Sequence, residues 1–98
     1  MSWSVYLKDG DVDSIGCTSN LAPMFRAAGL GVRSLNDMPC SEALAPLRTA
    51  INAMEDDPSK FKALNPPNGW GDYLSGLEFL REVRAMCVEH PEDTLVVT

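Results

Sequence analysis

Two short stretches of the sequence carry residue types that could bind a ligand. The first is Thr18-Ser19-Asn20, where two hydroxyls and a carboxamide stand together just before a run of regularly spaced apolar residues. Such side chains often accept a hydrogen bond from an unpaired N–H at the start of a helix. They could equally face a ligand, with the N–H groups of the helix start directed at an anion. Both interpretations are open at this point.

The second stretch is the loop Asn68-Gly69-Trp70-Gly71, followed by Asp72 and Tyr73. Glycines let a ligand approach the backbone closely, and an indole offers a flat stacking face. The alternative is a tight turn with Trp70 inserted between helices. Asp72 argues against a strongly anionic ligand, because its carboxylate would occupy the positive end of the helix that follows.

Both stretches precede a predicted helix, so their side chains would share a cleft if the two helix starts converge. The residues that we predict to bind a ligand there are Thr18, Ser19, Asn20, Asn68, Gly69, Trp70, Gly71 and Tyr73. The polar groups and the indole would suit a small polar, nucleotide-like ligand, held without being transformed. The alternative is an exposed apolar or acidic patch that grips a partner protein.

Catalytic motifs are missing from the sequence. It contains no GxSxG, HExxH or phosphate-binding Walker motif. Cys87 and His90 are three residues apart, and a thiol beside an imidazole could act as a nucleophile, but such neighbours are usually incidental. We therefore predict no catalytic residue, no cofactor and a protein that is not an enzyme.

Metal sites and disulfides are not expected either. The three cysteines, Cys17, Cys40 and Cys87, are an odd number without a CxxC pair, which favours buried thiols in a reducing cytoplasm. A calcium-loop spacing occurs at Asp9, Asp11 and Asp13. However, Ser14 and Asn20 stand where that loop requires Gly and Glu, so we predict a turn and no metal.

The composition predicts one small acidic domain that spans residues 1–98. There are 14 acidic and 8 basic residues, for a net charge of −6, which argues against nonspecific binding of nucleic acid. The acidic clusters 55–57 and 89–93 are either solvated surface or a docking patch for a basic partner. No apolar run approaches the roughly 18 residues that span a bilayer, and the first residues lack the pattern of a secretory signal. We expect a cytoplasmic location, with the protein either a monomer or a homodimer.

The elements that must position these residues follow from the hydrophobic pattern. Alternation at Trp3, Val5 and Leu7 predicts a strand, and Asp9-Gly10 predicts a tight hairpin turn to a second strand at 12–17. A helix should start at Ser19 or Asn20 as its cap, and Gly29 should end it. The connector 31–39 should turn Val32 and Leu35 inward.

Three more helices and a strand complete the chain. A helix is expected over 41–55, where Pro46 predicts a kink or a later start. Asp57 should cap a short helix over 58–64, with Phe61 and Leu64 buried, and Asp72 should cap a helix over 73–89. A β-branched run predicts a strand at 94–98. The result is an α+β domain: a small, mainly antiparallel sheet, made of the N-terminal hairpin plus the C-terminal strand, covered on one face by three or four helices.

Three motifs together resemble a known family. Residues 18–25 fit T-[SY]-N-x-x-P-M-[FW], Met54 to Pro58 fit M-x-x-x-P, and Asn68 to Tyr73 fit N-G-W-G-x-Y. This combination is similar to small proteins of bacteriophages, especially those of actinobacteria, and of prophage regions. The resemblance covers residues 16–97 and implies a phage accessory protein in the host cytoplasm. Such a protein would neutralise or redirect a host component by binding, for example to counter a host defence, and the family carries no settled activity.

Overall fold

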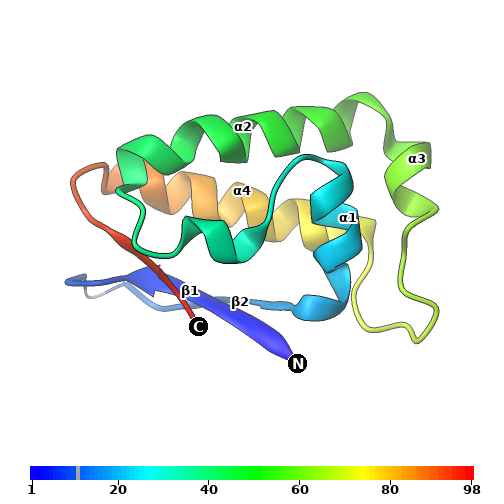
Figure 1. Ribbon diagram of the computed structural model, residues 1–98, viewed down its shortest axis with the longest axis horizontal. Helices are drawn as coiled ribbons and strands as arrows, with labels where there is room; N and C mark the ends of the chain where they lie inside the picture. Colours follow the sequence, from blue (N-terminus) through cyan, green and yellow to red (C-terminus); the bar gives the residue numbers. More distant parts are fainter. Residues whose placement is uncertain (11) are drawn as a thin grey trace.

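The computed structural model describes residues 1–10 and 12–98, which form an α+β domain as predicted. A three-stranded sheet forms one layer, and the helices cover one of its faces (Figure 1). The elements in chain order are β1 (Ser2–Leu7), β2 (Ile15–Thr18), the 3₁₀ turn η1 (Ser19–Leu21), α1 (Ala22–Ala27), the 3₁₀ turn η2 (Val32–Leu35), α2 (Cys40–Asp56), α3 (Pro58–Lys62), α4 (Tyr73–Glu89) and β3 (Leu95–Val97).

β1 is the central strand of the sheet. It pairs antiparallel with β2, with Trp3 opposite Cys17, and antiparallel with β3, with Val5 opposite Val97. The predicted alternation is confirmed, because Trp3, Val5 and Leu7 are buried while the side chains between them are more exposed. The N-terminal hairpin and the C-terminal strand therefore form one sheet, as the sequence indicates.

The helices α2 and α4 run antiparallel, side by side, over the inner face of the sheet (Figure 1). Their apolar stripes are buried, and α1 packs against the N-terminal half of α4 through Phe25 and Gly76. A Cβ on Gly76 would lie 3.3 Å from both the Leu21 and Phe25 side chains. This close packing accounts for a glycine inside a helix, where it costs about 1 kcal/mol relative to alanine.

The hairpin connection is longer than the sequence predicts. β2 starts at Ile15 rather than Val12, so residues 8–14 connect the strands and the predicted two-residue Asp9-Gly10 turn is wrong. Gly10 turns back against its own strand, since a Cβ there would lie 2.8 Å from the Cβ of Leu7. Asp11, the middle residue of the calcium-like spacing, lies outside the described residues.

The helix starts also differ from expectation. Thr18, not Ser19 or Asn20, caps the first turn, and that turn is 3₁₀ before α1 begins. α2 begins at Cys40 and continues through Pro46, so a later start is wrong. Its first turn is stabilised from outside, because the backbone N–H of Cys40 donates to the carbonyl oxygen of Asp93 at 2.8 Å and that of Ser41 to Pro91 at 3.1 Å.

The other predicted boundaries hold with small shifts. Asp57 caps α3 and Asp72 caps α4, while Gly29 has the expected positive φ of 89° after α1. Phe61 is buried, but α3 ends at Lys62 and Leu64 is 38% exposed, contrary to expectation.

Candidate functional site

Gly71 joins the two stretches that the sequence singles out. A Cβ built on it would lie 2.6 Å from Cγ2 of Thr18 and 3.1 Å from Cγ of Leu21, and its φ is +94°. Only glycine combines this backbone conformation with such a close approach. The backbone of the 68–71 loop therefore lies directly against η1, and the two stretches meet there.

The polar groups at this junction are bonded mainly to their own stretch. Oγ1 of Thr18 accepts hydrogen bonds from the backbone N–H of Asn20 at 3.3 Å and from its Nδ2 at 3.1 Å. Oδ1 of Asn68 accepts from the backbone N–H of Trp70 at 3.0 Å. These are the bonds of a helix cap and a tight turn. The structural interpretation of both stretches thus accounts for Thr18, Asn20 and Asn68.

Asp72 and Tyr73 fix the start of α4. Oδ1 of Asp72 accepts from the backbone N–H of Ser75 at 2.8 Å, and the backbone N–H of Asp72 donates to Oγ of Ser75 at 3.0 Å, which completes a capping box. These bonds, the backbone one first, lower the pKa of Asp72 below its usual value. The ionised carboxylate therefore already occupies the positive end of the helix.

Tyr73 belongs to the core rather than to a ligand-facing surface. Its ring is buried, its hydroxyl donates to the carbonyl oxygen of Met54 at 2.7 Å, and its backbone N–H donates to Oδ1 of Asn65 at 2.8 Å. Met54 lies in the last turn of α2, where carbonyl groups lack a partner within the helix. We therefore remove Tyr73 from the predicted ligand-binding residues.

Trp70 is not inserted between helices. Its side chain is 65% exposed, and Leu74, four residues later, is 68% exposed. The exposed Leu64 belongs to the same region, because the neighbouring Asn65 is bonded to Tyr73. We call Leu64, Trp70 and Leu74 the Trp70 surface. Three of the six exposed large apolar side chains of the described residues thus fall within positions 64–74.

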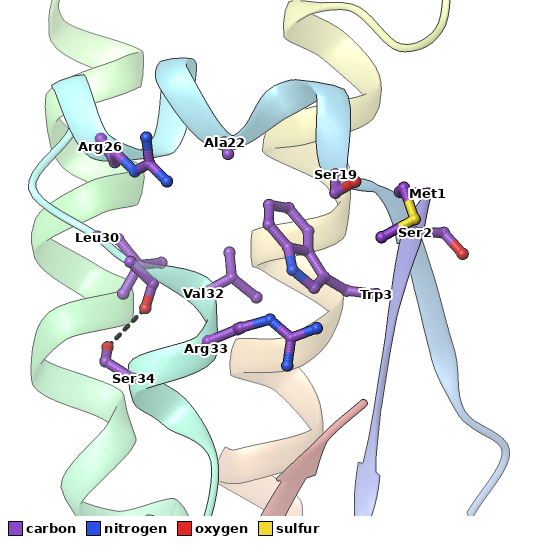
Figure 2. A pocket seen from close by; sticks show the side chains of 11 residues that line it. Met1, Ser2, Trp3, Ser19, Ala22, Arg26, Leu30, Val32, Arg33 and Ser34 are labelled. Carbon is purple, nitrogen blue, oxygen red and sulfur yellow. Dashed lines mark hydrogen bonds between the residues drawn. The ribbon is translucent and has the colours of Figure 1, made fainter.

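Ser19 faces a different region, a cavity of about 310 Å³ between β1, α1, η1 and η2 (Figure 2). Its lining combines hydroxyls, apolar groups and two arginines, and Ser19 is the only residue there from the predicted site. The lining residues are Met1, Ser2, Trp3, Ser19, Ala22, Arg26, Leu30, Gly31, Val32, Arg33 and Ser34. We call this space the arginine cavity.

Arg26 and Arg33 give the arginine cavity its charge. Both are exposed, and neither forms an ion pair with any residue in the described part of the chain. Although 14 residues of the chain are acidic, none of them lines this cavity. The cavity is therefore a positive site on a protein with a net charge of −6.

Sequence reasoning missed Arg26, Arg33 and Trp3, and one signal could have found the arginines. They are the only basic residues between positions 9 and 47, and they flank the turn Gly29-Leu30-Gly31. A turn between two lone arginines can bring both side chains to one space. Trp3 gave no such signal, because its position in the strand alternation predicts only a buried side chain.

A second hollow, of about 320 Å³, lies at the loop after α4. It is lined by Glu89, His90, Pro91, Glu92 and Asp93, and Nδ1 of His90 is 3.7 Å from Oδ2 of Asp93. Within residues 1–10 and 12–98, no three His, Cys, Asp or Glu side chains are grouped so as to hold a metal ion. This hollow thus offers an acidic surface and one imidazole.

The thiols are not prepared for nucleophilic chemistry. Cys40 and Cys87 are buried, and burial raises the pKa of Cys87 to about 12, with the neighbouring Cys40 thiol contributing. Burial also raises the pKa of the half-buried Cys17 to about 11. A thiol is an effective nucleophile only as a thiolate. Cys87 and His90 therefore do not form an activated pair, and Cys40 and Cys87 are buried thiols as predicted.

None of the described helices has the length and apolar character needed to cross a membrane.

Comparisons with known proteins assign the chain to no family. The phage resemblance stays a prediction from the motifs. No protein-family model, no curated protein and no solved structure matches the chain.

Proposed function

We propose that the protein acts by non-catalytic binding, and that the Trp70 surface docks a partner protein. One contrast carries this proposal. The polar side chains of Thr18, Asn20, Asn68 and Tyr73 are bonded internally, whereas Trp70 and Leu74 are about two-thirds exposed. Exposed, clustered apolar side chains are typical of protein-binding surfaces.

The backbone of the loop that carries Trp70 is held on both sides. Asn68 closes the turn before Trp70, Gly71 rests on Thr18, and Asp72 is locked in its capping box. A loop whose backbone is already ordered loses little further backbone entropy when it binds. Tryptophan is also among the residues that most often dominate binding energy at interfaces. These features favour Trp70 as the central anchor.

The same geometry argues against a small polar ligand at this junction. Neither of the two cavities described above is lined by a residue from positions 64–74. Small ligands are generally enclosed by concave sites that bury most of their surface. A partner protein can instead supply the concave side and receive the indole. If the chain is a phage protein, as the motifs indicate, the partner is a host protein.

The partner should present an apolar pocket that accepts an indole and a neighbouring leucine. Lys62 precedes Leu64 by two residues, and its Nζ lies 5.5 Å from the centre of the ring of Tyr73, the residue before Leu74. An acidic group at the edge of the partner's pocket would therefore be favourable. A charge of this kind at the rim mainly affects the rate of association and the choice of partner.

A capture experiment with matched variants tests the proposal. The tagged protein is incubated with lysate of the bacterial host, alongside the variant Trp70→Ser/Leu74→Ser and the control Val88→Ser. Val88 is 62% exposed on α4 but lies near the far end of that helix. We expect a protein that the wild type and Val88→Ser retain and that the double variant loses. With that protein purified, Trp70→Ala should weaken binding by about 30-fold or more.

The fluorescence of Trp70 provides the direct readout. In Trp3→Phe, Trp70 is the only tryptophan of the chain. Its emission should shift to the blue when the purified partner is added, because the indole leaves water. Retention that is equal for the wild type and the double variant would exclude the Trp70 surface, as would an emission that the partner leaves unchanged.

A further inference from the structure

We propose that the arginine cavity is a separate binding site for a small phosphomonoester, whose phosphate is held by Arg26 and Arg33. The site lies outside the Trp70 surface and does not depend on the function proposed for that surface. The argument rests on the placement of the two guanidinium groups, the missing negative charge, an available indole N–H and the size of the space.

The two arginines come from separate elements that a turn brings together. Arg26 is in the last turn of α1 and Arg33 is in η2, and Gly29 reverses the chain between them with its φ of +89°. Both side chains line the same cavity, and Arg33 extends from η2 towards Trp3 (Figure 2). The cavity thus receives positive charge from two of its walls.

Because both positive side chains line one cavity and no negative group does, an anion that enters it is attracted from both sides. No carboxylate of the described residues does so, because neither guanidinium has an acidic partner within 4.0 Å. A phosphate suits this arrangement, because guanidinium groups donate parallel hydrogen bonds to two of its oxygens. The structure therefore points to an anion supplied from outside the chain.

Trp3 adds a third donor. Trp3 is only 6% exposed, and its indole N–H donates no hydrogen bond to any residue of 1–10 and 12–98. Yet no side-chain nitrogen in the described residues is both fully buried and unpartnered. The indole nitrogen therefore reaches solvent, and Figure 2 places the indole at the wall of the cavity. Trp3 can donate to a third oxygen, which a tetrahedral phosphate has and a carboxylate lacks.

The volume indicates more than a bare phosphate ion. A space of about 310 Å³ is at the lower end of the range of small-molecule pockets, which is roughly 300–1,000 Å³. Ala22, Leu30 and Val32 supply an apolar part of the lining. The ligand that fits both properties is a phosphomonoester with a compact organic group, about the size of a mononucleotide or a sugar phosphate.

Tryptophan fluorescence can follow binding at this site alone. In Trp70→Phe, Trp3 is the only tryptophan. We would titrate this variant with AMP, ribose 5-phosphate and inorganic phosphate, and with adenosine as the uncharged counterpart of AMP. A saturable change in Trp3 emission is expected with AMP or ribose 5-phosphate, weaker with inorganic phosphate and none with adenosine. The change should decline as salt rises, since salt screens the interaction.

Charge-matched variants separate a specific site from general attraction. Arg26→Gln and Arg33→Gln, each made in Trp70→Phe, should raise the dissociation constant at least tenfold. Arg48→Gln removes the same charge from an exposed position in α2 outside the cavity and should leave it unchanged. Circular dichroism should show all three variants folded.

Three outcomes would overturn the proposal. The first is no saturable response to any of the phosphates at millimolar concentration. The second is a response to adenosine equal to that of AMP. The third is an equal loss of affinity in Arg48→Gln and Arg33→Gln. None of these outcomes bears on the Trp70 surface. The titrations are carried out without the partner protein, and Trp70 is already replaced in the variant that they use.

Discussion

The Trp70 surface and the arginine cavity are both built against the 3₁₀ turn η1, but they use their residues in opposite ways. On the side of the Trp70 surface, Gly71 packs against Thr18 and Leu21, and the side chains of Thr18, Asn68 and Asp72 accept hydrogen bonds from nearby backbone N–H groups. On the side of the cavity, Ser19 lines a space in which two arginines have no partner among the described residues. The first region presents exposed apolar side chains on an internally bonded backbone, whereas the second carries two positive charges without an acidic partner.

This difference suggests that one set of residues stabilises the fold and another set is available for binding. Residues whose hydrogen bonds are complete contribute mainly to stability, and their replacement should be visible in unfolding experiments. Residues that are exposed or unpaired contribute little to stability, and their replacement should be visible only in binding. Four predictions test this division, beginning with the largest expected effect.

Gly71→Ala should destabilise the protein by about 2–4 kcal/mol. The new Cβ would lie 2.6 Å from Cγ2 of Thr18, and the positive φ adds strain. Gly69→Ala is the matched control, because Gly69 also has a positive φ, of 76°, but nothing lies within 4 Å of the added Cβ. It should cost only about 1 kcal/mol. Denaturant unfolding measures both, and equal losses would mean that the loop does not rest on η1.

Tyr73→Phe should cost about 1–2 kcal/mol, because the carbonyl of Met54 loses the hydroxyl that satisfies it in a buried position. Tyr6→Phe serves as the control, since the half-buried Tyr6 has no hydrogen bond from its hydroxyl to the rest of the described chain. Its replacement should be almost neutral in the same unfolding experiment. A neutral Tyr73→Phe would return that hydroxyl to the candidate ligand contacts.

The cap of α4 should give the protein a dependence on acid. Because the pKa of Asp72 is lowered in the folded state, its ionised form stabilises the protein above the unfolded pKa of about 4. This contribution is lost as the pH falls through the folded pKa. The stability difference between the wild type and Asp72→Asn should therefore shrink as the pH falls from 6 to 2.

The exposed Glu92, which caps no helix, supplies the comparison for Asp72. Thermal melting of Glu92→Gln over the same pH range should run parallel to that of the wild type. A difference between the wild type and Asp72→Asn that stays constant with pH would show that the charge of the cap is unimportant.

The smallest effects on stability are expected where binding is proposed. Trp70→Ala and the double variant Arg26→Gln/Arg33→Gln should each change the free energy of unfolding by no more than about 0.5 kcal/mol, because these side chains are exposed and unpaired. The same unfolding assay measures both. A clear loss of stability in either would assign that region to the fold and weaken its proposed role.

The sequence predicts the parts of the fold that depend on local pattern. Alternation at Trp3, Val5 and Leu7 is enough to predict the strand β1, and the apolar stripe after Asp72 is enough to predict the helix α4. The connection between β1 and β2 is mispredicted, because Asp9-Gly10 allows a tight turn but the register is set by the pairing of Trp3 with Cys17 and of Val5 with Ile15. Register depends on tertiary packing that a turn motif does not contain.

The candidate site is only partly predictable for the same reason. That Gly71 meets Thr18 depends on how α4 and η1 pack, and this follows from Leu21, Phe25 and Gly76 rather than from the two motifs. The arginine cavity depends on the turn at Gly29, which places Arg33 opposite β1. The lone arginines were visible in the sequence, but the space between them was not.

The central position of β1 has a consequence for how the chain folds. β1 pairs with β3, and Val5 meets Val97 across almost the whole length of the described chain. Pairings that join distant residues are slow, because the intervening chain must be ordered before the contact forms. During synthesis on the ribosome, β1 would therefore wait for its second neighbour until β3 emerged. We expect the antiparallel helices α2 and α4 to associate first and to offer the surface on which the sheet is then completed.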